Sequence, residues 1–305
     1  MKFSIYKESR QGGRESNEDR IGYCYSRDAL MMVVADGMGG HLHGEVAAQI
    51  AVQFLTEAFQ REAAPKLADP FLFLLKNITS AHHAILDYAE VRGLLETPRT
   101  TCVVAIVQNS VAWWAHVGDS RLYHIRNGRI HTRTKDHSRV QKLIDQGRVR
   151  EEAAGEHPDR NKIFSCLGAM TGPQIELSRK LALQSGDTLI LCTDGFWSPL
   201  SGRAICTELL KSGIMVAIPR LLEMAEVRAG LGCDNLSVVA MTWAESYAQA
   251  SDQVSTQTLD PNAFNTMMEE FGRPEAGTSP SDLSEEEIER AISEIRNAIR
   301  KQTDK

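Results

Sequence analysis

The chain has 305 residues, of which 42% are hydrophobic and 24% are charged, and its formal net charge is −6. This length suits one large domain or two smaller ones, and the negative charge gives no general attraction for nucleic acid, so any phosphate site must supply local positive charge. No apolar stretch is long enough to span a bilayer and the N-terminal segment lacks a signal-peptide core, so we expect no membrane association and a cytoplasmic location.

Short β-rich runs and longer helical patterns share the first 243 residues. The predicted strands, in chain order, are Leu30–Ala35, Cys102–Val107, Val111–Val117, Leu122–Ile125, Arg129–Thr134, Thr188–Thr193 and Leu236–Thr242. Asn127-Gly128 joins two of them and is typical of a type I′ hairpin turn. Apolar residues at helical spacing predict three amphipathic helices, over 46–59, 71–91 and 218–229. Hairpins followed by long helices favour an α+β fold, with antiparallel sheets covered by helices, over alternating βαβ units.

The composition changes after Trp243. Residues 244–260 are polar without a strand or helix period, which predicts a linker. Residues 261–305 carry two apolar stripes at helical spacing, Phe264/Met267/Met268/Phe271 and Ile288/Ile292/Ile295/Ile299. We therefore divide the chain into a domain over 1–243, a linker over 244–260 and a helical tail over 261–305. Docking of the tail on its own domain, binding to a partner, self-association and disorder all remain open.

Acidic residues recur where a β-rich run meets a turn. They are Glu18 and Asp19 in R-E-S-N-E-D, Asp36 in V-A-D-G-M, Asp119 in V-G-D-S-R, Asp194 in L-C-T-D-G and Asp234 in C-D-N-L-S. A single aspartate at such a place usually forms a turn or a helix cap. Several in one chain, each beside a strand, favour a common site at one edge of a sheet.

Carboxylates that gather without basic partners repel one another, and divalent cations relieve that repulsion. Ligand sets made only of oxygen favour Mg²⁺, Mn²⁺ or Ca²⁺ over Zn²⁺ or Cu²⁺. Because Gly37 permits a tight turn, its carbonyl oxygen could bind an ion beside the Asp36 side chain.

Seven ordered motifs over about residues 10–243 resemble those of bacterial type 2C serine/threonine protein phosphatases. They are R-x-x-N-E-D, A-D-G-M-G-G-H, V-G-D-S-R-x-Y, D-H-S-x-V, H-P-x-R-N, D-G and D-N-x-S-V. The resemblance implies a four-layer α-β-β-α sandwich of two antiparallel sheets flanked by helices. It also implies metal-dependent hydrolysis of phosphoserine and phosphothreonine in proteins by a metal-activated water.

The resemblance also implies roles for individual residues. Asp36 would bridge two core Mn²⁺ or Mg²⁺ ions, with the Gly37 carbonyl on one of them, while Asp194 and Asp234 would hold the second. Glu18 and Asp19 would surround the pair, and Asp119 with Asp194 would bind a third, weaker ion. Arg14 would grip the substrate phosphate. The substrates would be phosphorylated proteins, targets of a serine/threonine kinase.

Two positions depart from the family pattern. Arg99 stands where the family often has glycine in G-T-T, which puts the local backbone geometry in question. Met38 occupies the place of a histidine that eukaryotic members carry as a proposed general acid, so His41 is the candidate acid here. His137–Arg160 would form a mobile flap beside the site or an ordinary surface subdomain, and His116 is expected to be a core or half-buried histidine.

Other phosphate chemistries lack their signatures. None of the six cysteines has an arginine six residues later, as a cysteine-nucleophile phosphatase requires, and the cysteines are expected to be reduced and buried. The Gly37–Gly40 segment lacks the lysine of a P-loop, and no G-x-S-x-G elbow is present. The main alternative is a weakly active or inactive regulator that uses the same fold to bind phosphoproteins.

Overall fold

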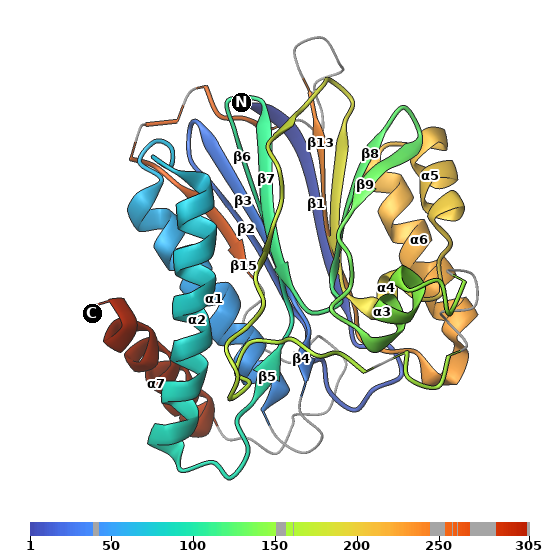
Figure 1. Cartoon of the computed structure of the whole chain (residues 1–305). Helices are drawn as coiled ribbons and strands as arrows, with labels where there is room; N and C mark the ends of the chain where they lie inside the picture. The colour runs from blue at the N-terminus through green and yellow to red at the C-terminus, as the bar shows by residue number, and fades with distance from the viewer. Residues whose placement is uncertain are drawn as a thin grey trace.

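Two antiparallel sheets lie face to face in this computed structural model, and helices cover both outer faces (Figure 1). The structure describes residues 1–38, 43–150, 157–160, 162–244, 254–257, 259–260, 262–268 and 285–303. This architecture confirms the predicted α+β sandwich with four layers.

The first sheet brings the two ends of the predicted domain together. Its strand order is β14 (Val254–Ser255), β1 (Lys2–Arg10), β13 (Leu236–Trp243), β12 (Thr188–Cys192), β8 (Arg121–Arg126) and β9 (Arg129–Arg133). Strand β13 pairs with β1 along its whole length, from Trp243 opposite Phe3 to Leu236 opposite Arg10. Asn127 and Gly128 both have positive φ, 51° and 68°, which confirms the predicted turn between β8 and β9.

The second sheet has seven strands, six on its main path and one further strand beside β7. The order is β10 (Glu176–Leu177), β7 (Val111–Val117), β6 (Cys102–Gln108), β3 (Ala29–Ala35), β2 (Arg20–Tyr25) and β15 (Asn265–Met268) along the hydrogen-bonded path, and β11 (Leu181–Ala182) also pairs with β7. A separate short ladder joins β4 (Gly37–Met38) to β5 (Arg99–Thr100). This ladder matters because it follows directly after Asp36.

Helices form where apolar periodicity meets capping residues. The helices are α1 (Gly44–Glu62), α2 (Pro70–Arg92), α3 (Arg139–Asp145), α4 (Asp194–Trp197), α5 (Gly202–Lys211), α6 (Ile214–Ala229) and α7 (Glu285–Thr303), with a 3₁₀ turn η2 at Gly230–Gly232. Helix α2 is an example: the Asp69 side chain accepts hydrogen bonds from the N–H groups of Phe71 and Leu72, and Pro70 occupies the first turn. Gly93 ends the helix in the left-handed conformation. The three predicted helices are confirmed, although α6 begins four residues before its predicted start at Ile218.

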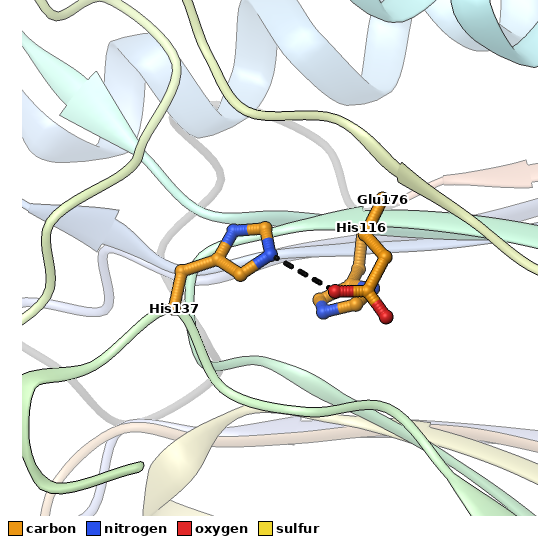
Figure 2. Close-up of side chains that lie close together, drawn as sticks. All are labelled: His116, His137 and Glu176. Carbon is orange, nitrogen blue, oxygen red and sulfur yellow. Dashed lines mark ion pairs between the residues drawn. The ribbon is translucent and has the colours of Figure 1, made fainter. Parts of the chain in front are cut away.

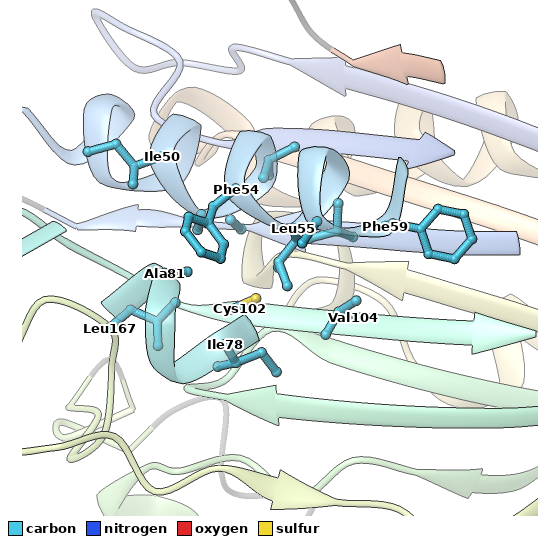
Figure 3. Packing of buried hydrophobic residues seen from close by; sticks show 14 of the residues in the cluster. Ile50, Phe54, Leu55, Phe59, Ile78, Ala81, Cys102, Val104 and Leu167 are labelled. Carbon is cyan, nitrogen blue, oxygen red and sulfur yellow. The ribbon is translucent and has the colours of Figure 1, made fainter. Parts of the chain in front are cut away.

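Apolar side chains fill three layers between these elements. One cluster lies between the two sheets, and a second lies between the first sheet and helices α4, α5 and α6. Figure 3 shows part of the third cluster, in which Phe54 and Leu55 of α1 and Ile78 of α2 pack over Cys102 and Val104 of β6. All six cysteines are buried and unpaired, as expected. Among the described residues, no helix combines the length and apolar character needed to cross a membrane.

The C-terminal segments add to both sheets and to the helical layer. The helical prediction was wrong for the first stripe, because Asn265–Met268 forms strand β15 on the edge of β2, while Phe271 lies outside the described residues. Backbone pairing with a free sheet edge outweighs a short helical period, because those hydrogen bonds come from a distant part of the chain.

The second stripe does form a helix, α7, which packs on α2 (Figure 1). Ile295 and Ile299 are buried in the third cluster, and Lys301 and Gln302 both contact Asp87 of α2. Within the expected linker, β14 pairs with β1, and the Thr256 hydroxyl donates to the carbonyl of Arg27 at 2.6 Å. The division at residues 243 and 260 stays a prediction.

Candidate metal centre

The acidic residues predicted from the sequence meet at one edge of the sandwich because of strand direction. In the second sheet β3 ends just before Asp36, and its antiparallel neighbour β2 begins just after Glu18 and Asp19. In the first sheet β12 ends just before Asp194, and its antiparallel neighbour β13 begins just after Asp234. Asp119 lies in the connection that leads from β7 of one sheet to β8 of the other.

The backbone around Asp36 is fixed by two threonines. Thr101 exchanges hydrogen bonds with it: the Asp36 N–H donates to the Thr101 hydroxyl at 3.0 Å, and the Thr101 N–H donates to the Asp36 carbonyl at 2.9 Å. The Thr100 hydroxyl also donates to that carbonyl at 2.9 Å. Gly37 has no room for a side chain, since a Cβ would lie 2.4 Å from the Gly44 carbonyl oxygen. These contacts hold Asp36 rigidly at the end of β3.

The second pair of carboxylates is brought together by a close approach of two turns. A Cβ on Gly195 would lie 2.1 Å from the Asn235 carbonyl oxygen, so glycine is needed after Asp194. Asn235 then ties this turn to the N-terminal loop. Its amide donates to the carbonyls of Gln11 and Ser16 at 2.8 and 2.9 Å, and its Oδ1 accepts from the Glu18 N–H at 2.9 Å.

These side chains line an open cavity of about 580 Å³. Its walls include Glu18, Asp36, Gly37, Asp119, Asp194 and Asp234. Arg14 is the only cationic side chain among the described residues that line it, and its Nη2 donates to Asp234 Oδ2 at 2.6 Å. Asp19 is buried behind this wall, where the Thr193 hydroxyl donates to its Oδ2 at 2.9 Å.

Burial and mutual repulsion raise the pKa values of several of these carboxylates. Burial first, and then the charge of Asp19, raises the pKa of Asp36 well above its usual value. Burial and Asp194 do the same to the pKa of Asp119. Burial raises the pKa of Asp19 to about 8 against the hydrogen bonds from Ser237 and Thr193, and burial with Asp234 raises the pKa of Asp194 to about 6.

This donor set fits hard divalent cations. Carboxylate oxygens and a backbone carbonyl are the ligands that Mg²⁺ and Mn²⁺ prefer. A cation at this point would let buried carboxylates ionise that otherwise hold their protons. The arrangement can therefore hold metal ions beside Arg14, a side chain suited to a phosphate group.

A second cavity, of about 490 Å³, adjoins the first and shares Asp119 and Asp194 with it. Arg121, Trp197 and Arg160 also line this second cavity. Arg121 makes a bidentate ion pair with Asp136, at 2.8 and 2.7 Å, and its guanidinium lies 3.3 Å from the centre of a Trp197 ring. Helix α3, which follows Asp136 in the segment predicted as a flap, also lines this cavity.

Every predicted metal ligand lies at this edge, whereas His41 lies outside the described residues, as does Asn161 of the H-P-x-R-N motif. Arg99 is exposed in β5 and does not have positive φ, so the arginine fits the strand that pins Asp36. The residues that the sequence did not reveal are the polar tethers Thr101, Thr193 and Asn235. Their signal was weak, because a threonine or asparagine beside a turn is common in any protein.

The family model described as protein phosphatase 2C matches residues 8–217. The serine/threonine phosphatase stp of Listeria innocua is 33% identical over 228 residues, covering 74% of this chain and 90% of that protein.

Two solved structures are similar over most of the chain. The serine/threonine phosphatase of S. agalactiae has a TM-score of 0.72 and 28% identity, covering 80% of this chain and 100% of that one. The catalytic domain of the phosphatase PstP in complex with two manganese ions has a TM-score of 0.68 and 30% identity, covering 80% of this chain and 99% of that one.

Proposed function

The chain belongs to the protein phosphatase 2C family and is a metal-dependent serine/threonine protein phosphatase, and we propose that the carboxylate cluster at the edge of its sandwich is the catalytic centre. The observation that carries this proposal is the convergence of Asp36, Asp119, Asp194 and Asp234 on one cavity that also holds Arg14. A similar phosphatase has been solved with two manganese ions, which supports Mn²⁺ as the ion here.

Asp36 would bridge the two core ions, and the Gly37 carbonyl would complete one of them. Asp194 and Asp234 would hold the other, and Glu18 and Asp19 would surround the pair. Asp119 and Asp194 would form the weaker third site, open to Mn²⁺ or Mg²⁺. When bound, such ions lower the pKa of a water toward neutrality and offset the charge of the phosphoryl oxygens.

Arg14 would bind the phosphate of the substrate. A guanidinium matches two phosphate oxygens at once, and such charged hydrogen bonds contribute about 1.5–3 kcal/mol. Arg14 is more than half exposed, with 57% of its side chain accessible, so it can reach a group that enters from solvent. His41 remains the candidate general acid.

The second cavity would receive the polypeptide around the phosphorylated residue. Its lining includes Asp119 and Asp194 of the metal centre and residues of α3, so a substrate chain could extend into it from the metal centre. The substrates would be proteins phosphorylated by a serine/threonine kinase in the cytoplasm. A role as an inactive phosphoprotein-binding regulator is disfavoured, because loss of activity usually removes metal ligands and all the expected ones are present.

Hydrolysis of p-nitrophenyl phosphate with and without Mn²⁺ tests the proposed site. We expect turnover that depends on Mn²⁺ and disappears when Asp194 is replaced by alanine. An Asp194→Ala protein with normal Mn²⁺-dependent turnover would show that the reaction occurs elsewhere.

A further inference from the structure

Two buried histidines and a glutamate gather on the second sheet, outside the carboxylate cluster. His116 on β7 lies opposite Glu176 on β10 in the strand register, and His137 approaches from the segment between β9 and α3. Figure 2 shows His137 and Glu176 pointing toward one another beside His116. One nitrogen or oxygen atom from each residue lies within 4.8 Å of the other two, and His137 Nε2 is 3.6 Å from Glu176 Oε2.

His116 is held as a metal-binding histidine is held. Its Nε2 lies 2.7 Å from the carbonyl oxygen of Lys135. Because a carbonyl can only accept, Nε2 carries the proton and Nδ1 presents a lone pair. Only 1% of the residue is exposed, so Nδ1 is buried, and it has no hydrogen-bond partner among the described residues. Ligating histidines commonly donate their other ring N–H to a backbone carbonyl, so the orphaned Nδ1 points to a missing ligand.

We propose that His116, His137 and Glu176 bind one Zn²⁺ ion at a site separate from the carboxylate cluster. Two imidazoles and a carboxylate, with water as the fourth ligand, form a common tetrahedral zinc set. Ligand atoms about 2.0–2.1 Å from a tetrahedral ion lie about 3.4 Å apart, close to the 3.6 Å between His137 and Glu176. Small inward movements of the three side chains would bring all their ligand atoms to this separation.

The surroundings favour zinc over the hard ions of the carboxylate cluster. His116 and Glu176 line a cavity of about 400 Å³ through which an ion can enter. Arg133, Arg179 and Lys180 line the same cavity, and their charges oppose the binding of any cation. An ion must therefore be bound by coordination to nitrogen, which suits Zn²⁺ better than Mg²⁺ or Mn²⁺.

Binding would act on the segment that borders the metal centre. His137 Nδ1 accepts a hydrogen bond from the Gly118 N–H at 3.2 Å. Nε2 therefore carries the ring proton in the metal-free protein. With Zn²⁺ on Nε2, that proton would move to Nδ1, and the hydrogen bond from the Gly118 N–H would be lost. Gly118 precedes Asp119, and His137 leads into α3, so zinc would shift both the third metal site and the wall of the second cavity.

The test uses the full chain loaded with Mn²⁺ and titrated with Zn²⁺ by calorimetry. We expect one further equivalent of Zn²⁺ in the wild type and in His131→Gln, a control that changes a histidine of the same cavity outside the cluster. Glu176→Gln and His116→Gln should weaken that binding by at least about tenfold. Co²⁺ should give the strong visible absorption of a four-coordinate ion with nitrogen ligands, and Asp36→Asn should keep that absorption.

The variants separate this proposal from the catalytic one. Zn²⁺ binding that is lost in Asp36→Asn but unchanged in Glu176→Gln would place the ion in the carboxylate cluster and overturn the proposal. If His116→Gln does not fold, Glu176→Gln decides alone, because 55% of the Glu176 side chain is exposed and its replacement leaves the core intact. Failure of phosphatase activity in the wild type would leave the expected Zn²⁺ titration unchanged.

Discussion

Arg14 Nη2 and Asp234 Oδ2 form a 2.6 Å ion pair that joins the N-terminal loop to the start of β13. The pair links the residue proposed to bind phosphate with a residue proposed to bind metal. Asp234 makes the largest contribution to the raised pKa of Arg14, and Asp194 and Glu18 add smaller contributions. Arg14 is thereby held at the metal centre before substrate arrives.

Replacing Arg14 by alanine should raise KM for a phosphopeptide by roughly ten- to a hundredfold, the equivalent of one charged phosphate contact. Mn²⁺ affinity should stay the same or rise, because the guanidinium no longer competes for Asp234. Steady-state kinetics and calorimetry measure the two effects. Arg14→Lys is the matched control, which keeps the charge and loses the bidentate geometry, so its KM should be intermediate. A normal KM in Arg14→Ala would show that Arg14 does not bind the substrate phosphate.

Asp36→Asn should abolish turnover and weaken binding at both core metal positions, because one neutral amide replaces the proposed bridging carboxylate. Calorimetric titration with Mn²⁺ gives the stoichiometry directly. Asp28→Asn serves as the control, since Asp28 pairs with Arg27 and does not line the metal cavity. Unchanged Mn²⁺ stoichiometry in Asp36→Asn would disprove the bridge.

The metal-free protein should lose stability as pH rises. The folded pKa of Asp19, about 8, lies above the value near 3.9 of an unfolded aspartate, so the fold binds protons that the unfolded chain has released. Stability is therefore greatest below about pH 4 for this group and falls as pH rises to about 8. Mn²⁺ should reverse this trend, because its affinity for the carboxylates increases with pH. At a hundred times its Kd, Mn²⁺ should add about 2.7 kcal/mol per site to the free energy of unfolding.

Thermal melting at about pH 5.5 and about pH 8, with EDTA or with Mn²⁺, measures this dependence. The gain in melting temperature from Mn²⁺ should be larger at the higher pH. Equal gains at both values would mean that the carboxylates do not release protons to the metal.

Asn235→Ala should destabilise the fold by about 1–3 kcal/mol and reduce activity, although Asn235 is not among the proposed ligands. Its side chain makes three hydrogen bonds to the backbone of residues 11–18, the loop that carries Arg14 and Glu18. Urea unfolding gives the loss of stability. Asn262→Ala, at an exposed asparagine far from this loop in sequence, should unfold like the wild type, and a similar result for Asn235→Ala would refute the tether.

Truncation after residue 284 should lower stability by a few kcal/mol, because burying each of Ile295 and Ile299 contributes about 1.5–3 kcal/mol. Hydrolysis of a small aryl phosphate should stay within a few-fold of normal, since no described residue of α7 lines the metal cavity. Arg296→Ala, at an exposed position on the same helix, should change neither property. Loss of aryl phosphate hydrolysis in a folded truncated protein would show that α7 supports the catalytic centre.

The sequence was most informative where a pattern is local. The runs before Asp36 and Asp194 predicted both the strands and the carboxylates at their ends, because an apolar run that stops at Asp-Gly marks a buried strand meeting a turn. Strand β15 could not be found in this way, since its residues also have helical spacing and only the exposed edge of β2 decides between the two. The pairing of His116 with Glu176 depends in the same manner on a strand register that no local pattern contains.

The pairing of β1 with β13 has a consequence for how the protein is made. Phe3 lies opposite Trp243, so the central ladder of the first sheet cannot form until the ribosome has released nearly the whole catalytic region. Contacts this distant in sequence slow folding, because a very long loop must close first. Asp36 and Asp234 come together only in that late step, so an incomplete nascent chain cannot assemble the metal centre. Newly made protein would therefore begin to dephosphorylate other proteins only once β1 has paired with β13.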